Sequence, residues 1–414
     1  MLNRSNLSDI ELLIKHGANP TQIDQADSWT ALHCFAWAGE DLKVLEILLK
    51  HTVDGVKPDI NARDWQGNTP LHFLLLRRDV PKILLKAFLL HGADVNNEND
   101  HSARPLHMAC QYGDLEILKI LHESKAITDI DDQDDRGSTA LHEAALYGHP
   151  KCIELLCKAN ANTDIQMVAK CDGRAALHDV AWMGSKECME ILLKHGANPN
   201  ILDKHNRTPL FFACLDVVNE EKAELLLDTL LEQNVHLSEI NKLTKRRRTP
   251  LREAAAHGFE HVVEKLIKTA ELSNDLASLA LDTQDTRRGM TPLHRAAWLG
   301  KAGCVRLLLE ANAKVTIRDN SIGGGKTALI PAYEHWAGAS YQGAFEDIVS
   351  RLVDKDPDAA VADPELAAVC AINGSTRLLQ KPVQWAQILV VKTSTVGHPW
   401  NWLATIAKSM PVTS

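Results

Sequence analysis

Short apolar stripes recur along the chain and are separated by polar, turn-rich stretches. In segments such as VLEILLK (44–50) and CVRLLLE (304–310), apolar residues are spaced three and four apart, which places them on one face of a helix. Each such segment follows a glycine and a shorter, alanine-rich apolar stretch such as TPLHRAAW (291–298). The pattern therefore predicts pairs of short helices, with a polar linker between one pair and the next.

A four-residue block opens the first helix of each predicted pair. The blocks are TALH at 30, TPLH at 69, RPLH at 104, TALH at 139, AALH at 175, TPLF at 208, TPLR at 249, TPLH at 291 and TALI at 327. The intervals run from 33 residues (175 to 208) to 42 residues (249 to 291). Threonine is a favourable helix N-cap and proline suits the first helical position. A repeat of this period predicts an array of stacked units.

Small residues mark the predicted ends of both helices. Nine positions after the block begins, glycine ends the first helix in six repeats, at Gly39, Gly113, Gly148, Gly184, Gly258 and Gly300. The second helix ends at residues that accept the left-handed conformation best, namely Gly17, Gly92, Gly196, Asn160 and Asn312.

These blocks and spacings resemble the ankyrin repeat family, whose unit of about 33 residues carries T-P-L-H-x-A. The resemblance covers roughly residues 5–380. It implies an all-α ankyrin-repeat solenoid of about nine recognisable repeats, in which the linkers form β-hairpin fingers. We expect a degenerate N-terminal half-repeat or cap at 1–26, the repeat array at 27–362, degenerate capping helices at 363–392 and a disordered tail at 393–414.

Several features depart from the regular unit. The linkers 228–248 and 268–290 are long, and we expect enlarged fingers or inter-repeat loops there. The resemblance implies that the block histidine hydrogen-bonds the backbone of neighbouring turns. The repeats expected to lose part of that network are those in which Phe211, Arg252 and Ile330 replace it.

Composition and charge indicate the class of protein. The 414 residues are 45% hydrophobic with a net charge of −9, which indicates a folded soluble protein rather than a general nucleic-acid binder. Nine cysteines without a C-x-x-C pair, mostly in apolar helical contexts, indicate a reducing compartment. The N-terminus lacks the apolar core of a signal peptide, so we expect a cytoplasmic protein. KRRR at 245–248 also fits a minimal nuclear import signal.

Motifs that suggest catalysis or metal binding fit the repeat better. HGFEH (257–261) satisfies H-x-x-E-H, but Gly258 should end a helix and so separate its two histidines. GGGKTALI (323–330) lacks the first glycine of a P-loop, because Asn320 stands in its place. The block histidines lie one repeat apart, too far to share an ion. We therefore predict no catalytic residues, no cofactor and no metal site.

Large aromatic residues mark the candidate partner-binding surface. In the ankyrin family, first helices and fingers line a concave groove, and the slot seven residues after the block begins faces it. Exposed tryptophan and tyrosine are enriched at binding hot spots, but the same rings could instead pack on neighbouring helices. The candidates in this slot, in the next slot and in one finger are Trp37, Trp182, Trp298, Tyr112, Tyr147 and Trp65.

Charge is segregated among the predicted fingers. DIDDQDDR (129–136) makes one finger acidic, whereas KRRR (245–248) and an arginine pair make two successive fingers basic. We expect the basic fingers to form one positive patch for an acidic partner, and the alternative is solvated finger tips. The basic candidates are Arg246, Arg247, Arg287 and Arg288.

Together these features predict a non-catalytic scaffold that binds a protein or peptide partner through the groove and the finger tips. We expect no small-molecule substrate, no nucleic acid and no membrane as partner. LSDIELLIKHGANP (7–20) matches only the second half of a repeat. The alternative function is therefore the recognition arm of a larger signalling receptor or multidomain enzyme whose N-terminal part is missing from this chain.

Overall fold

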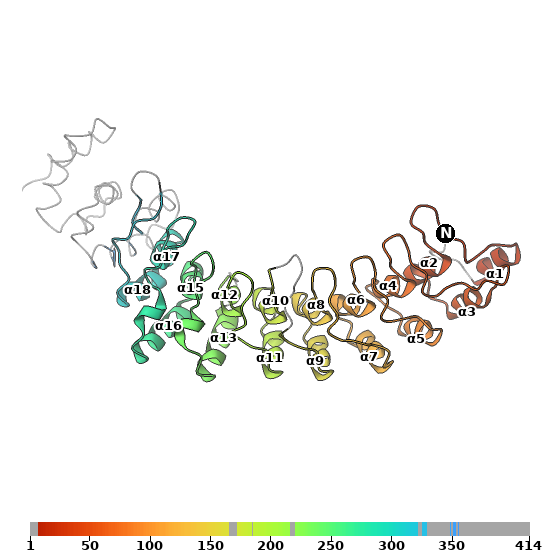
Figure 1. The fold of residues 1–414 in the computed structure, drawn as a ribbon, viewed down its shortest axis with the longest axis horizontal. Coiled ribbons are helices and arrows are strands. Elements are labelled where there is room, and N and C mark those ends of the chain that lie inside the picture. Colours follow the sequence, from red (N-terminus) through yellow and green to blue (C-terminus); the bar gives the residue numbers. More distant parts are fainter. Residues whose placement is uncertain are drawn as a thin grey trace, which may run out of the picture. The chain divides into compact units, whose positions relative to one another are not determined.

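The chain is seen in a computed structural model that divides into two compact units, Met1–Lys204 (unit 1) and His205–Ser414 (unit 2). Within the described residues the regular secondary structure is helical, and no strand occurs there (Figure 1). The residues described are 7–164, 172–183, 185–215, 220–321, 325–328, 348, 351–352 and 355. Outside them lie Gly184, Ile330, the predicted capping helices at 363–392 and the predicted tail at 393–414.

Unit 1 stacks its helices in two rows, and each helix contacts the next one in its row. Figure 1 shows the first row beside the finger loops and the second row away from them. The first helices are α2 (Ala31–Ala38), α4 (Pro70–Leu75), α6 (Pro105–Tyr112), α8 (Ala140–Leu146) and α10 (Ala176–Trp182). The second helices are α1 (Leu7–Lys15), α3 (Leu42–Lys50), α5 (Lys82–Leu90), α7 (Leu115–Glu123), α9 (Pro150–Lys158) and α11 (Lys186–Lys194).

Unit 2 has the same two-row arrangement. Its first helices are α12 (Pro209–Ala213), α15 (Pro250–His257) and α17 (Pro292–Trp298). Its second helices are α13 (Glu220–Glu232), α16 (Glu260–Leu272) and α18 (Ala302–Glu310), and two short helices, α14 (Leu237–Ile240) and η1 (Leu276–Leu279), pack against each other and on α16. The block at Thr327 lies at the edge of the described part, so the count of nine repeats stays a prediction.

The long linkers at 228–248 and 268–290 are partly helical, so the prediction of enlarged fingers or loops is wrong for those parts. Helices α13 and α16 run for 13 residues each, whereas α3 in unit 1 has 9. Their apolar stripes continue for a further turn through the buried Leu230 and Ala270. The short helices α14 and η1 bury Leu237 and Leu279. Because the added residues are apolar at helical spacing, a longer helix removes more apolar surface from water than a loop would.

Each first helix begins at its block, as the sequence predicts. In the block at 139, the Thr139 hydroxyl accepts a hydrogen bond from the His142 N–H (3.4 Å), and Nδ1 of His142 accepts one from the Thr139 N–H (3.2 Å). Where proline follows the threonine, as Pro70 does, it occupies the first turn. The block therefore supplies partners to backbone groups that a helix N-terminus would otherwise leave without one.

The block histidine also ties its repeat to the next finger. Nε2 of His33 lies 3.0 Å from the Asn68 carbonyl oxygen, and the same bond joins His72 to Ala103, His107 to Ser138, His142 to Arg174 and His294 to Lys326. A carbonyl oxygen only accepts, so Nε2 carries the proton, while Nδ1 accepts from the block. The ring is therefore neutral. Burial lowers the pKa of His72 and His142 to about 4, in agreement with a neutral ring.

Arg252 stands in place of the block histidine, and its repeat keeps a link to the next finger by an ion pair in place of the expected backbone hydrogen bond. The Arg252 guanidinium forms an ion pair with the Asp285 carboxylate of the next finger and donates to Glu253 (2.6 Å). Arg248 donates to both oxygens of Glu253, at 2.7 and 2.5 Å. Only 4% of Arg252 and 1% of Glu253 is exposed. A buried ion network therefore replaces the bond from histidine to carbonyl.

The linkers fold as tight fingers built on a carboxylate. In the finger at 64–68, the Asp64 N–H donates to the Asn68 carbonyl (2.9 Å), and the Asp64 carboxylate accepts from the N–H groups of Gln66 and Asn68. Adjacent fingers are joined by a backbone bond, as from the Asp100 N–H to the Gln66 carbonyl (2.8 Å). The fingers are thus hairpin turns, but the arms are too short for the paired strands implied by the family resemblance.

Helix ends follow the predicted residues with one exception. Gly113 and Gly258 end first helices in the left-handed conformation (φ 72° and 87°), and Asn160 and Asn312 adopt it after second helices (φ 65° and 68°). Gly39 instead has φ −79°, and a Cβ there would approach the Phe35 ring to 2.2 Å. Position 39 therefore requires glycine for lack of space rather than for its conformation.

The first prediction is that acidification from pH 7 to pH 5 destabilises the fold. The buried block histidines have pKa values below the 6.5 of an exposed histidine. A lowered pKa contributes stability above pH 6.5, and this stability is lost as the pH falls toward the folded-state value, about 4 for His72 and His142. We expect a loss of about 1 kcal/mol per pH unit for each histidine that titrates in this window.

Urea unfolding followed by circular dichroism at pH 7, 6 and 5 measures this loss. His72→Gln with His142→Gln should reduce the pH dependence, whereas His16→Gln, at an exposed position, should leave it unchanged. Burial raises the pKa of Asp179 to about 7, so protonation of this group stabilises the fold as the pH falls from 7 to 5. This single group opposes the effect of several histidines, so we still expect a net loss of stability. A free energy of unfolding that is constant from pH 7 to pH 5 would contradict the prediction.

A second prediction concerns the buried ion network of unit 2. Glu253→Gln removes the buried carboxylate that Arg248 and Arg252 share and leaves Arg252 with Asp285 alone, so we expect the free energy of unfolding of unit 2 to fall by about 3 kcal/mol. Glu310→Gln is the matched control, because Glu310 pairs with Arg306 at 3.2 Å on the surface, and it should change stability by less than about 0.5 kcal/mol. Equal losses in the two variants, measured by urea unfolding, would contradict a role for burial.

Candidate partner-binding surface

Four of the predicted aromatic candidates lie at the C-terminal ends of first helices in unit 1. Trp37, Tyr112 and Trp182 belong to α2, α6 and α10, and Tyr147 follows α8 directly. Their exposed fractions are 48%, 42%, 44% and 50%. The amide of Gln111 donates to the Tyr147 hydroxyl (3.1 Å), which links the ends of α6 and α8. We call these four residues the aromatic row.

The environment of Trp37 combines packing with exposure. Its ring lies edge-on to Phe73 of α4, with 6.2 Å between centroids, and Phe73 also packs against Trp29 at 4.7 Å. Phe73 is buried, so it supports the inner edge of Trp37 while nearly half of the indole faces solvent. Trp65, the finger candidate, is 60% exposed, and its backbone N–H donates to the Asp27 carbonyl (3.2 Å). Exposure and packing coexist in this cluster.

Arginine side chains lie over two of the tryptophans. The Arg174 guanidinium stands 5.3 Å from the ring centroid of Trp182. In unit 2, Trp298 lies between Arg288 at 5.1 Å and Arg295 at 4.9 Å, and its exposure is intermediate. A cation over an indole face restrains the ring. Cation–π contacts therefore restrain both tryptophans, and Trp298 has two of them.

Two neighbouring fingers of unit 2 bring the predicted basic residues together. The Thr286 N–H donates to the Arg246 carbonyl (3.2 Å), which joins the fingers at 244–248 and 285–290. Within the described part of the chain, no carboxylate lies within ion-pair distance of Lys245, Arg246, Arg247, Arg287 or Arg288. The exposed side chains of these basic fingers are Lys245, Arg246, Arg247, Arg287 and Arg288.

The acidic finger uses much of its charge internally. The Asp134 carboxylate is buried and accepts the N–H groups of Arg136 and Ser138 (2.9 and 2.7 Å). Asp131 accepts the Asn162 N–H (2.9 Å), and Asp132 forms an ion pair with Arg104. Finger carboxylates that cap turns do not face a partner. The sequence therefore overstated the free negative charge of residues 129–136.

The two enzyme-like motifs belong to the repeat, as predicted. His257 is the last residue of α15 and His261 lies in α16, with the left-handed Gly258 between the helices. In GGGKTALI, the Lys326 N–H donates to the Asp319 carboxylate (2.8 Å) and the Lys326 carbonyl accepts from the Asp319 N–H (2.9 Å). Lys326 thus closes a finger.

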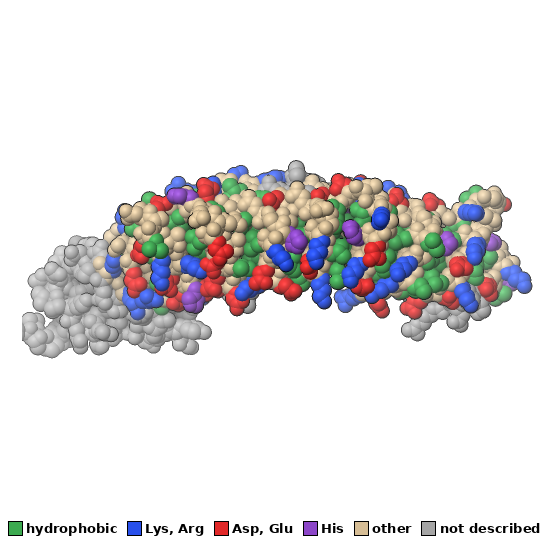
Figure 2. All heavy atoms as spheres, turned by 90° about the horizontal axis from the view of Figure 1, so that it is seen from below, with side chains coloured by type: hydrophobic (Ala, Val, Ile, Leu, Met, Phe, Trp, Pro, Cys, Tyr) green, Lys and Arg blue, Asp and Glu red, His purple; other side chains and the backbone are tan. Residues whose placement is uncertain are grey.

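The second helices present a different surface. Figure 2 views the molecule from the side on which these helices lie in Figure 1, and Lys, Arg, Asp and Glu side chains are mixed there. Single exposed apolar residues such as Leu90 and Leu272 interrupt them. Among the described residues, no helix is both long and apolar enough to cross a membrane. The aromatic row and the basic fingers therefore differ in composition from the mixed-charge surface of the second helices.

Segments of the chain are similar to parts of larger ankyrin-containing proteins. A segment of 116 residues (28% of this chain) is 31% identical to a putative ankyrin repeat protein of fowlpox virus. A segment of 113 residues (27% of this chain) is 34% identical to the transient receptor potential cation channel subfamily A member 1 homologue of Caenorhabditis elegans. A segment of 96 residues (23% of this chain) is 32% identical to the human transient receptor potential cation channel subfamily A member 1. The chain spans 15%, 8% and 8% of these relatives.

The crystal structure of the human ASB11 ankyrin repeat domain covers 60% of this chain and 98% of its own, with 26% identity and a TM-score of 0.46. The family model of ankyrin repeats (3 copies) matches residues 2–87, 82–167, 161–236 and 227–319, well over half of the chain. Ankyrin repeats form protein–protein interaction domains, and their fold is typically non-enzymatic. With this match and with the capped, histidine-bridged helix pairs described above, the chain belongs to the ankyrin repeat family.

Proposed function

We propose that the chain is a scaffold that binds a protein or peptide through the first-helix surface of unit 1, with the aromatic row as anchor. The observation that carries the proposal is the similar exposure of its four rings, between 42% and 50%, at the C-terminal ends of four of the five first helices of unit 1. Half-exposed, restrained rings lose little conformational freedom on binding and bury a large area. These properties are typical of anchors rather than of scattered surface residues.

The basic fingers of unit 2 are proposed to attract acidic segments of a partner. Five exposed cationic side chains on two hydrogen-bonded fingers create a local positive field in a chain with a net charge of −9. Such a field raises the rate of association with acidic partners more than it strengthens the final complex. We place this interaction in the cytoplasm, and an acidic nuclear import receptor is one such partner for residues 245–248.

A second candidate function is that of recognition arm in a larger receptor. Two of the relatives are cation channels by name, and the matched segment is 8% of each. A repeat array of this kind then serves as the binding part of a longer polypeptide. Sequencing full-length transcripts from the source decides this, because a reading frame continuous with a channel domain supports the arm, and a stop codon upstream of Met1 rejects it.

A third prediction tests the aromatic row. Trp37→Ala with Trp182→Ala should weaken partner binding by about 2 kcal/mol, or roughly thirtyfold in Kd. Leu90→Ala, which truncates an 85% exposed residue on a second helix, is the matched control and should bind normally. Partners are first identified by mass spectrometry of proteins captured by the wild-type chain but not by the double variant, and Kd is then measured by calorimetry. Unchanged Kd in a folded double variant would refute the anchor.

A fourth prediction tests the basic fingers. Arg246→Ala with Arg287→Ala should lower the association rate constant of an acidic partner by about tenfold at low ionic strength and reduce its salt dependence. The control is Lys268→Ala, which removes an exposed charge of a second helix in the same unit. Stopped-flow binding at 20 to 300 mM salt, as an order-of-magnitude range, provides the measurement. An identical salt dependence in the double variant and the control would exclude steering by these fingers.

A further inference from the structure

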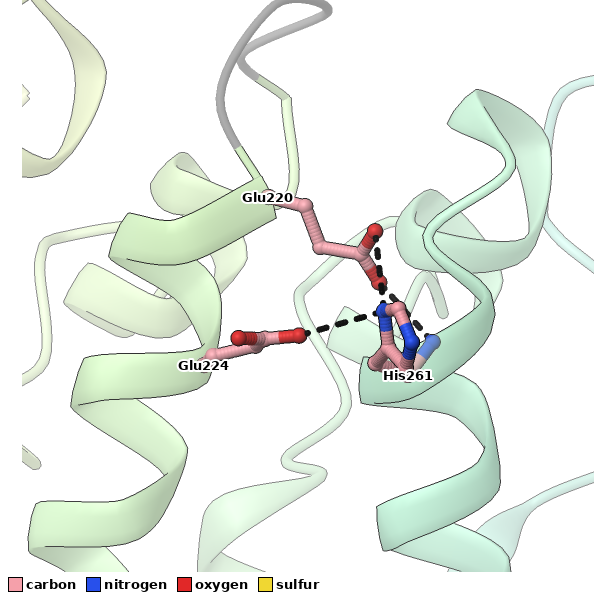
Figure 3. Close-up of side chains that lie close together, drawn as sticks. All are labelled: Glu220, Glu224 and His261. Atoms are coloured by element: carbon pink, nitrogen blue, oxygen red, sulfur yellow. Dashed lines mark hydrogen bonds and ion pairs between the residues drawn. The ribbon is translucent and has the colours of Figure 1, made fainter.

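Three ligand-forming side chains meet between two second helices of unit 2. Glu220 and Glu224 lie one turn apart on α13, and His261 lies in the first turn of α16 (Figure 3). One atom from each side chain lies within 4.8 Å of the others. Helices α13 and α16 contact each other directly, so the packing of the unit itself brings these atoms together.

The separations match a shared cation better than direct hydrogen bonds. Nδ1 of His261 lies 3.4 Å from Oε1 of Glu224 and 3.7 Å from Oε2 of Glu220. A charge-assisted bond from a protonated imidazole would measure about 2.7–2.9 Å. Two ligands of one tetrahedral zinc ion, each about 2.0–2.1 Å from the metal, are separated by about 3.3–3.4 Å. The 3.4 Å separation matches this spacing, the 3.7 Å separation is slightly longer, and all three ligand atoms lie within 4.8 Å of one another.

One of the carboxylates is already oriented by the backbone. Oε1 of Glu220 accepts hydrogen bonds from the N–H groups of His261 (2.9 Å) and Val262 (3.2 Å) at the start of α16. These bonds leave Oε2 directed toward the imidazole, as Figure 3 shows. A ligand held by a second shell of this kind needs little reorganisation to bind a metal.

At the next turn of the same two helices, a lysine stands opposite a carboxylate. One turn further along, Asp228 of α13 forms an ion pair with Lys265 of α16, so a permanent cation offsets the carboxylate. At the turn above, two carboxylates face the imidazole of His261. Lys265 is committed to Asp228, and Glu264 on the same helix pairs with Lys268. Both lysines are thus paired with other carboxylates, and His261 is the basic side chain that faces Glu220 and Glu224.

We propose that Glu220, Glu224 and His261 bind a divalent cation of the zinc class. Two carboxylate oxygens and one imidazole nitrogen are ligands that zinc and its neighbours in the transition series accept. The side chains of Glu220, Glu224 and His261 are 26%, 36% and 77% exposed, so the ion has access and its fourth position faces solvent. No spacing in the sequence predicted this site, because Glu224 and His261 come from different repeats and meet only through the packing of α13 on α16.

Calorimetric titration of the full chain with zinc chloride at pH 7.5 tests the site. We expect one site in the wild-type chain that is weakened about a hundredfold or more by His261→Asn or by Glu224→Gln. His261→Lys supplies a permanent charge as Lys265 does, so it should keep the fold and abolish zinc binding at this site. Asp228→Asn is the matched control, because it removes a neighbouring carboxylate of α13 outside the cluster, and it should bind zinc like the wild type.

Cobalt provides an independent readout, since three protein ligands and a water give a visible absorption band when it substitutes for zinc. The band should appear with the wild type and with Asp228→Asn and disappear with His261→Lys. Identical isotherms for the wild-type and His261→Asn chains would overturn the proposal, because other histidines would then account for the heat. An equal loss in Asp228→Asn would also overturn it, since it would assign the effect to the general negative charge of α13.

Discussion

The structure depends on a neutral imidazole held between two repeats. Each block histidine accepts from the backbone at the start of its own helix and donates to a carbonyl of the next finger. This pair of bonds satisfies buried polar groups on both sides and fixes the distance between consecutive helix pairs. Because a protonated ring would place a donor against the block N–H, the same bonds that stabilise the stack also make it sensitive to acid.

With neighbouring repeats joined in this way, the remaining positions of each unit have separate roles. Apolar residues of both helices fill the interior, and the finger carboxylates close the turns. The ends of the first helices are needed for neither task, which allows Trp37, Tyr112, Tyr147 and Trp182 to stay half exposed. The repetition that stabilises the array therefore also presents rings on four of the five first helices of unit 1, an arrangement suited to an extended protein or peptide.

Unit 2 shows how the same plan accommodates different chemistry. Arg252 takes the place of the histidine, and its longer side chain reaches Asp285 in the next finger, so an ion pair replaces a hydrogen bond. Helices α13 and α16 are a turn longer than α3, and their contact aligns charged side chains of adjacent repeats. The pair of Asp228 with Lys265 and the cluster around His261 both arise from that alignment.

Local chemistry made the repeat predictable from the sequence. Threonine caps, block prolines and the left-handed Asn160 and Asn312 depend on residues within one unit, and the structure confirmed them. The bonds from the block histidines to the next finger were implied by the family resemblance, and the structure confirmed them too. Only tertiary structure decided which groups from different repeats meet, because that depends on helix length and packing across more than thirty intervening residues. Packing extended the helices into the long linkers and paired Arg252 with Asp285. It also engaged part of the charge of the acidic finger and brought Glu220, Glu224 and His261 within 4.8 Å of one another.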